Sequence, residues 1–75
     1  MGKRVKSILK NILDERNISI RGLADQTGIP FETLRRLYND TTVRYERNTL
    51  GRVCEVLNIN IEDILVLVDT VDDKK

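Results

Sequence analysis

Apolar residues near the start of the chain repeat with the period of an α-helix. Five of them are spaced i, i+3, i+4, i+7 and i+8 and therefore share one helical face: Val5, Ile8, Leu9, Ile12 and Leu13. Asn17 follows, and asparagine tolerates the left-handed conformation that often ends a helix. The pattern predicts a first helix that includes Val5 and ends at Asn17.

Two shorter helical segments follow, and a glycine separates them. Ser19 is a suitable N-cap, because its hydroxyl can accept from the free N–H groups of a first turn, and Gly28 ends this segment. The next segment begins at Pro30, whose missing N–H is not needed in a first turn, and ends at Asn39 and Asp40. The residues expected to face inward are Ile20, Leu23, Ala24, Leu34 and Leu37.

The remaining pattern predicts a loop and two further helices. Residues 41–47 show no clear period and are expected to form a long polar loop. Asn48 or Thr49 would cap a fourth helix that ends at Asn58, and Asn60 would cap a fifth. Their inner faces comprise Leu50, Val53, Cys54, Leu57, Ile61, Ile64, Leu65 and Val68. A strand remains the alternative for residues 64–68, where branched apolar residues are dense.

These segments predict an all-α fold, a compact bundle of five short helices. With 75 residues the chain has room for one domain, expected over residues 1–68 with a polar tail at 69–75. Cys54 is the single cysteine, so we expect no internal disulfide and a small apolar role in the core, with a redox switch as the alternative. No apolar run approaches the ~18 residues that span a bilayer, which predicts a soluble, cytoplasmic protein without a membrane partner.

Charge is distributed unevenly although the net charge is only +1. Residues 1–47 hold ten Lys and Arg against six Asp and Glu, or +4, and residues 48–75 hold three against six, or −3. A basic front and an acidic back are typical of a protein that faces phosphates on one side. Lopsided charge is also common in small proteins, so this feature alone decides nothing.

Residues 19–39 meet the requirements of a helix-turn-helix. Ala24 is small enough for two helices to cross closely, and Gly28 permits a positive φ at the turn. Apolar residues flank the turn and anchor the second helix: Leu23, Ile29, Leu34 and Leu37. Six residues at the required spacings predict this motif.

The string ISIRGLADQTGIPFETLRRLYND, followed by LGRVCEVLNINIEDIL, resembles the Cro/cI-type (XRE) helix-turn-helix family of phage and bacterial repressors. The resemblance implies a five-helix domain that binds double-stranded DNA, often as a dimer, with its third helix in the major groove. It implies a transcriptional regulator, most simply a repressor associated with the nucleoid. Three residues depart from the family pattern: Thr27 replaces an apolar residue, Ile20 a phosphate-holding glutamine and Asn58 a glycine.

The outward face of the third helix is the expected base-reading surface. Its residues are Phe31, Glu32, Arg35, Arg36 and Asn39. The resemblance places base contacts on Phe31, Glu32 and Arg36, which suit a thymine methyl, cytosine N4 and guanine O6/N7 respectively. Two alternatives stay open: Arg36 is a solvated residue paired with Glu32 at i, i+4, or Phe31 only covers the turn.

Phosphate contacts are expected around this helix, because they fix register without reading sequence. The candidates are Ser19, Arg21, Thr33, Arg35, Thr41, Thr42, Arg44, Tyr45 and Arg47. The N-terminal amides of the second helix add a natural phosphate site. Because residue 20 is not the family's glutamine, we expect the phosphates to be bound mainly by Arg21 and the loop. The alternative for residues 41–47 is a solvated loop without phosphate contacts.

Other function classes find little support in the residues. The chain has no histidine, no glycine-rich phosphate loop and no cysteine cluster, so we expect no enzyme activity, cofactor, metal or small-molecule ligand. The apolar run at residues 64–68 either completes the core or holds a second copy of the chain. The competing function is an antitoxin-like module that keeps this fold but mainly binds a partner protein.

Overall fold

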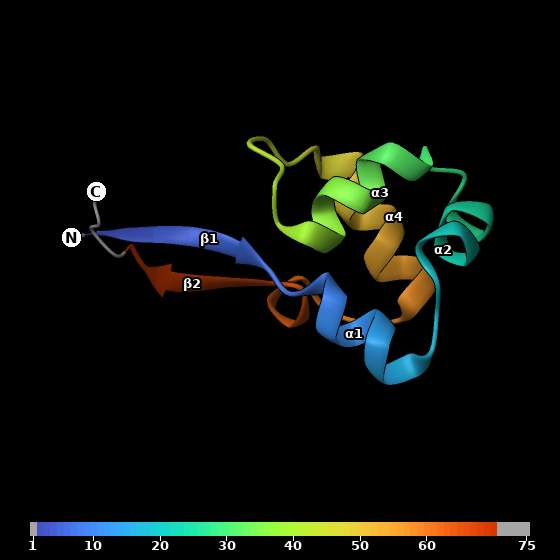
Figure 1. Cartoon of the computed structure of the whole chain (residues 1–75), viewed down its shortest axis with the longest axis horizontal. Coiled ribbons are helices and arrows are strands. Elements are labelled where there is room, and N and C mark those ends of the chain that lie inside the picture. The colour runs from blue at the N-terminus through green and yellow to red at the C-terminus, as the bar shows by residue number, and fades with distance from the viewer. Residues whose placement is uncertain (1, 71–75) are drawn as a thin grey trace.

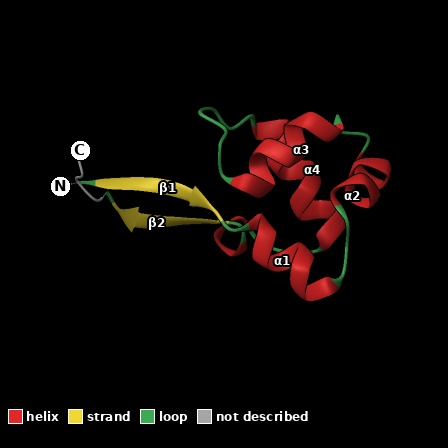
Figure 2. Cartoon of the chain, viewed as in Figure 1, coloured by secondary structure: helices red, strands yellow, loops and turns green. Residues whose placement is uncertain are grey.

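The computed structural model describes residues 2–70, which form a helical body and a two-stranded ribbon that projects from it (Figure 1). In chain order the elements are β1 (Lys3–Ser7), α1 (Leu9–Arg16), α2 (Ile20–Thr27), α3 (Phe31–Asn39), α4 (Arg47–Leu57), the 3₁₀-helix η1 (Ile61–Asp63) and β2 (Leu65–Asp69). Figure 2 shows the helices gathered at one end of the molecule and the ribbon at the other. Over the described range, no helix has the length and apolar character needed to cross a membrane.

The core of the body is built from the predicted inward positions. Its buried apolar residues are Leu9, Leu13, Leu23, Leu34, Leu37, Val53, Leu57 and Ile64. Burying one leucine contributes about 1.5–3 kcal/mol, so these side chains dominate the stability of a chain this short. Cys54 lies at the edge of this core and is half-buried, and burial raises the pKa of its thiol. The prediction that Cys54 acts as a small apolar residue agrees with this position.

Most helix ends lie where the sequence predicts them. Asn17, Gly28, Asp40 and Asn58 adopt the left-handed conformation directly after α1, α2, α3 and α4, with φ of 59°, 76°, 60° and 58°. Asparagine and aspartate enter this region more easily than other non-glycine residues, which accounts for Asn58 where the family often has glycine.

One helix start differs from the prediction. Helix α4 begins at Arg47 with Glu46 in the N-cap position, whereas the predicted caps are Asn48 or Thr49. The Glu46 carbonyl accepts from the Leu50 amide at 3.1 Å, and its carboxylate accepts from the Thr49 hydroxyl at 2.9 Å. These bonds extend the helix toward the loop by two or three residues.

The prediction of an all-α, five-helix bundle is wrong. Within residues 2–70 there are four α-helices, and both ends of the chain form strands that pair antiparallel, from Lys3 with Asp69 to Ser7 with Leu65. The apolar repeat that joined Val5 to the first helix is therefore broken at Ser7, and Val5 lies 39% exposed on the ribbon. Backbone pairing between segments some sixty residues apart, extended by the bond from the Ile8 amide to the Ile64 carbonyl, overrides the local pattern.

The expected fifth helix is reduced to a single turn. Asn60 does cap it, in a reciprocal capping box in which the Asp63 carboxylate accepts from the Asn60 amide at 2.9 Å. The turn ends at Asp63, and residues 65–69 continue as β2, so the strand alternative for residues 64–68 is the correct one in this region. Of the expected polar tail, Asp69 ends β2, the Thr70 amide donates to the Gly2 carbonyl, and residues 71–75 lie outside the described residues.

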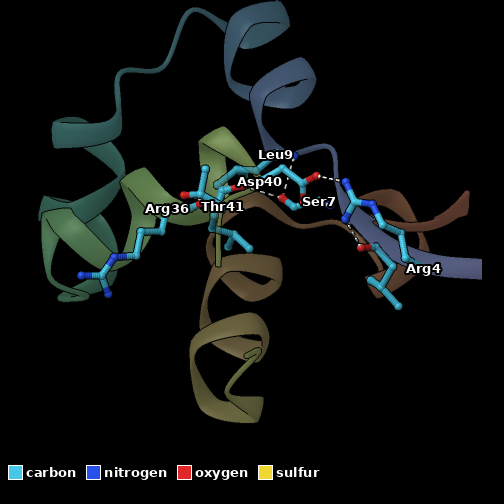
Figure 3. A network of polar contacts seen from close by, with 8 residues as sticks. Arg4, Ser7, Leu9, Arg36, Asp40 and Thr41 are labelled. Carbon is cyan, nitrogen blue, oxygen red and sulfur yellow. Dashed lines mark hydrogen bonds and ion pairs between the residues drawn. The ribbon is translucent and has the colours of Figure 1, made fainter. Parts of the chain in front are cut away.

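A partly buried polar network joins the ribbon to the C-terminal end of α3 (Figure 3). The Ser7 hydroxyl, which is buried, donates to the Leu37 carbonyl at 2.7 Å and accepts from the Leu9 amide at 3.3 Å. The Asp40 carboxylate accepts from the Ser7 amide at 2.9 Å and from the Arg4 guanidinium at 2.7 Å. Partial burial would raise the pKa of Asp40, but these two hydrogen bonds, together with the positive charges of Arg4 and Lys6, outweigh it and lower that pKa. The position of β1 is thus fixed relative to α3.

Candidate nucleic-acid interface

The turn between α2 and α3 is closed by local hydrogen bonds. The Gly28 amide donates to the Ala24 carbonyl at 2.8 Å while Gly28 holds a φ of 76°. Thr27 is buried, and its hydroxyl donates to the Leu23 carbonyl at 2.8 Å and accepts from the Ile29 amide at 3.1 Å. Thr27 thereby satisfies polar groups of the turn, which explains a threonine where an apolar residue is usual.

Packing of α3 on α2 and the core determines which face of α3 is open. Leu34 and Leu37 are buried, and the four residues on the opposite side are exposed: Glu32, Arg35, Arg36 and Asn39. The structure therefore brings these predicted residues together on one solvent-facing surface, which we call the α3 surface. Phe31, at the start of the helix, is half-buried.

On the α3 surface the carboxylate of Glu32 pairs with Arg35. The Arg35 guanidinium reaches it through Nη2 at 2.9 Å and Nε at 3.2 Å, one helical turn away. The hydrogen bond from Arg35 lowers the pKa of Glu32 and raises that of Arg35, so both groups stay ionised at neutral pH. Glu32 is thus an acceptor held in a defined orientation.

Arg36 is left without an internal partner on this surface. Among the described residues its guanidinium makes no hydrogen bond or ion pair, because Glu32 is engaged by Arg35 instead. The predicted alternative, an Arg36 to Glu32 pair at i, i+4, is therefore absent from the structure. Figure 3 shows the Arg36 side chain extending away from the ribbon network.

Phe31 and Arg21 connect the two helices of the motif. The Arg21 guanidinium lies over the Phe31 ring, 5.0 Å from its centre. This cation–π contact holds Arg21, on the first turn of α2, beside the start of α3. Phe31 is half-buried, so it has a structural role at the turn and is still partly accessible to a ligand.

The hydroxyl-bearing phosphate candidates are partly engaged within the protein. Ser19 caps α2 by accepting from the Gly22 amide at 2.9 Å, which confirms its predicted role as N-cap. Thr41 closes α3 through a bond from its amide to the Arg36 carbonyl at 2.9 Å, and the Thr42 hydroxyl donates to the Arg44 carbonyl at 2.7 Å. These bonds give shape to the loop between α3 and α4, which the sequence presented only as polar.

The remaining phosphate candidates are half-buried or exposed. Thr33 of α3 and Tyr45 of the loop are half-buried around a small cavity of about 80 Å³ between α3, the loop and α4, and burial raises the pKa of Tyr45. Arg44 and Arg47 are exposed and, in the described part of the chain, have no ion pair. Val43, which the sequence did not single out, is 93% exposed at the tip of the loop.

A further cation near the α3 surface was not among the candidates. Lys6 of β1 lines a hollow of about 270 Å³ at the C-terminal end of α3, together with Asn39 and Tyr38. The sequence pattern predicts a first helix that includes the neighbouring Val5, and only the pairing of β1 with β2 brings Lys6 here. No local signal in residues 3–7 identifies this neighbour.

Comparison with known proteins agrees with this geometry. The model of the Cro/C1-type HTH DNA-binding domain matches residues 8–70. A crystal structure of a candidate DNA-binding protein from Bacteroides fragilis superposes with a TM-score of 0.73 at 24% identity, covering 84% of this chain and 100% of that one. At this identity the likeness shows the shared fold. No curated protein matches the chain.

Proposed function

Because the chain belongs to the family of Cro/C1-type HTH DNA-binding domains, we propose that it is a sequence-specific transcriptional regulator that reads the major groove with α3. The protein would regulate transcription by occupying an operator, most simply as a repressor. It would act in the cytoplasm, bound to the nucleoid. A recognition helix in the major groove is the docking mode of helix-turn-helix proteins.

The observation that carries this proposal is the state of the charged groups on the α3 surface. Arg36 is exposed and unpaired among the described residues, while Glu32 is ionised and oriented by Arg35. A free guanidinium suits the O6 and N7 acceptors of guanine, and an oriented carboxylate suits the N4 donor of cytosine. We therefore assign base reading to Arg36 first and Glu32 second, with Phe31, Arg35 and Asn39 at the margins.

Backbone phosphates would be held around this surface by the cations that flank it. Arg21 lies beside the start of α3, Arg44 lies in the loop that follows α3, and Arg47 is the first residue of α4. We assign all three to phosphates that flank the groove. The hydroxyls proposed for the same task are those of Ser19, Thr33, Thr41, Thr42 and Tyr45. Ser19 and the first amides of α2 would act together as one phosphate site.

We also propose that two copies associate through β2. Leu67 is 67% exposed opposite Val5, and a two-stranded ribbon is marginally stable by itself. The outer edge of β1 carries Lys3, Arg4 and Lys6, so two β1 edges would repel, whereas β2 has the sequence LVLVD. Pairing of β2 with β2 of a second copy would form a four-stranded sheet and place two α3 surfaces on a two-fold operator.

Selection of binding sites from random double-stranded DNA tests the proposal directly. We expect an enriched, two-fold related motif, and we expect Arg36→Ala to lose preference at one base pair per half-site. The loss should be about 1–3 kcal/mol, the usual worth of a bidentate base contact. Lys3→Ala is the matched control, because it removes an equal charge from a residue that is paired with Asp69 away from the α3 surface.

A different outcome would support the competing function. If the wild-type protein binds DNA only weakly, without sequence preference and not at physiological salt, the regulator proposal fails. An antitoxin-like protein-interaction module would then be the better account of the fold.

A further inference from the structure

The positive side chains of the described residues fall into two groups. Residues 2–70 contain eleven lysines and arginines. Apart from Lys6, five form ion pairs (Lys3, Arg4, Lys10, Arg35 and Arg52) and one, Arg16, donates to the Leu57 carbonyl. The other four make no hydrogen bond or ion pair within these residues: Arg21, Arg36, Arg44 and Arg47. These four, of which Arg21 also lies over the Phe31 ring, all flank or form the proposed DNA surface. Lys6 is also uncommitted, yet it lies on β1, outside the helix-turn-helix.

Lys6 is nevertheless a neighbour of the α3 surface. It lines the hollow at the C-terminal end of α3 with Asn11, Tyr38 and Asn39. Asn39 is the last residue of α3 and belongs to the α3 surface itself. The hollow therefore continues that surface onto β1 and the start of α1.

The other charges around the hollow are already compensated. The Asp40 carboxylate is held by Arg4 and by the Ser7 amide, and Lys10 is bound to Asp14 at 2.9 Å. The Tyr38 hydroxyl also donates to Asp14, at 2.8 Å. Asp40 also lines the hollow and lies in the field of Lys6, but no hydrogen bond or ion pair joins the two within residues 2–70. The groups left for a ligand are therefore the ammonium group of Lys6 and the side-chain amides of the two asparagines, which together suit an anion.

We propose that Lys6, assisted by Asn39, binds a backbone phosphate of the DNA just beyond the C-terminal end of α3. The assignment rests on the proposed function. The hollow adjoins the α3 surface, so an anion bound there would be a phosphate of the DNA that the α3 surface contacts. Ser7 and Asp40 make the site possible, since they fix β1 against α3 and so hold the backbone of Lys6 in place. β1 would then act as a third phosphate-contacting segment beside α2 and the loop between α3 and α4.

Salt dependence of binding to the selected DNA tests this site, measured by fluorescence anisotropy between 50 and 200 mM salt. The slope of log K against log salt is negative, and each lost phosphate contact reduces its magnitude by about 0.9. We expect Lys6→Gln to reduce the magnitude of the slope by about that amount and to weaken binding to specific and non-specific DNA equally. Lys6→Arg should retain the wild-type slope. Lys3→Gln, on the same strand but paired with Asp69, should leave the slope unchanged.

The possible failures are distinguishable. If Lys6→Gln retains the wild-type slope while Arg44→Gln lowers it, the phosphate site at Lys6 is refuted and the regulator proposal stands. If Lys6→Gln and Lys3→Gln lower the slope equally, a diffuse field rather than a contact is responsible, and the site is again refuted. If the wild-type protein selects no motif and shows no salt-dependent binding, the proposed function has failed before this inference is tested.

Discussion

The helical body and the β1–β2 ribbon are stabilised in different ways. The body encloses eight buried apolar side chains, whereas the ribbon exposes Val5 and Leu67 and is attached mainly by polar contacts of Ser7 and Asp40. Burial of apolar area supplies most of the folding free energy, so the body should fold with little help from the ribbon. The ribbon instead presents the unpaired edge of β2, through which we propose that a second copy associates.

The largest expected effect comes from opening the core of the body. Leu34→Ala removes a fully buried side chain at the contact of α3 with the core and should cost about 2–5 kcal/mol of unfolding free energy, through lost burial and a cavity. Urea denaturation followed by circular dichroism measures it. The same truncation on the ribbon, Leu67→Ala, should change the stability of the monomer by about 0.5 kcal/mol or less. Similar losses in both variants would contradict the division between body and ribbon.

A smaller effect is expected at the joint between the two regions. Ser7→Ala deprives the Leu37 carbonyl and the Leu9 amide of a buried partner and should cost about 1–3 kcal/mol. Hydrogen exchange should show faster exchange of the paired amides of β1 and β2, with little change in α2 and α4. Thr70→Val, which removes an exposed hydroxyl bond to the Gly2 carbonyl, is the control. Unchanged exchange in the ribbon after Ser7→Ala would show that the joint is not stabilised by this hydroxyl.

The association of ribbons can be tested without disturbing the body. Leu67→Lys places like charges near each other in a β2–β2 pair and should raise the dimer dissociation constant at least about tenfold, equivalent to about 1.4 kcal/mol. Sedimentation velocity over a concentration series measures it. Val43→Lys makes the same change at the exposed loop tip and should leave the dimer intact. A wild-type chain that stays monomeric at all concentrations would refute the β2 interface.

The smallest effect is a pH dependence at the joint. The folded-state pKa of Asp40 is lowered below the unfolded value of about 3.9, so its contribution to stability is present above that pH and is lost as pH falls through the folded-state pKa. Asp40→Asn should therefore be less stable than the wild type at neutral pH, and the difference should shrink in acid. Denaturant midpoints at pH 7 and pH 3 measure this. A difference that is constant with pH would show that the ionised carboxylate is not what stabilises the joint.

Much of the body follows from short-range features of the sequence. Ser19, Gly28 and Asn58 mark helix ends because their conformational preferences act within one turn of the chain, and the buried leucines follow helical spacing. The outward set on α3 is equally predictable, since burial of Leu34 and Leu37 exposes the opposite face. The helix-turn-helix was accessible from the sequence for this reason.

The ribbon and the details of the site were decided by tertiary structure. Val5 fits either a helix or a strand, and the choice depends on β2, which lies some sixty residues later in the chain. Helical spacing allows Glu32 to pair with either Arg35 at i+3 or Arg36 at i+4. The side-chain geometry of the folded protein selects Arg35. Lys6 reaches the end of α3 only because Ser7 and Asp40 bind β1 there. Local preferences are encoded residue by residue, whereas these contacts join segments whose proximity exists only once the whole chain has folded.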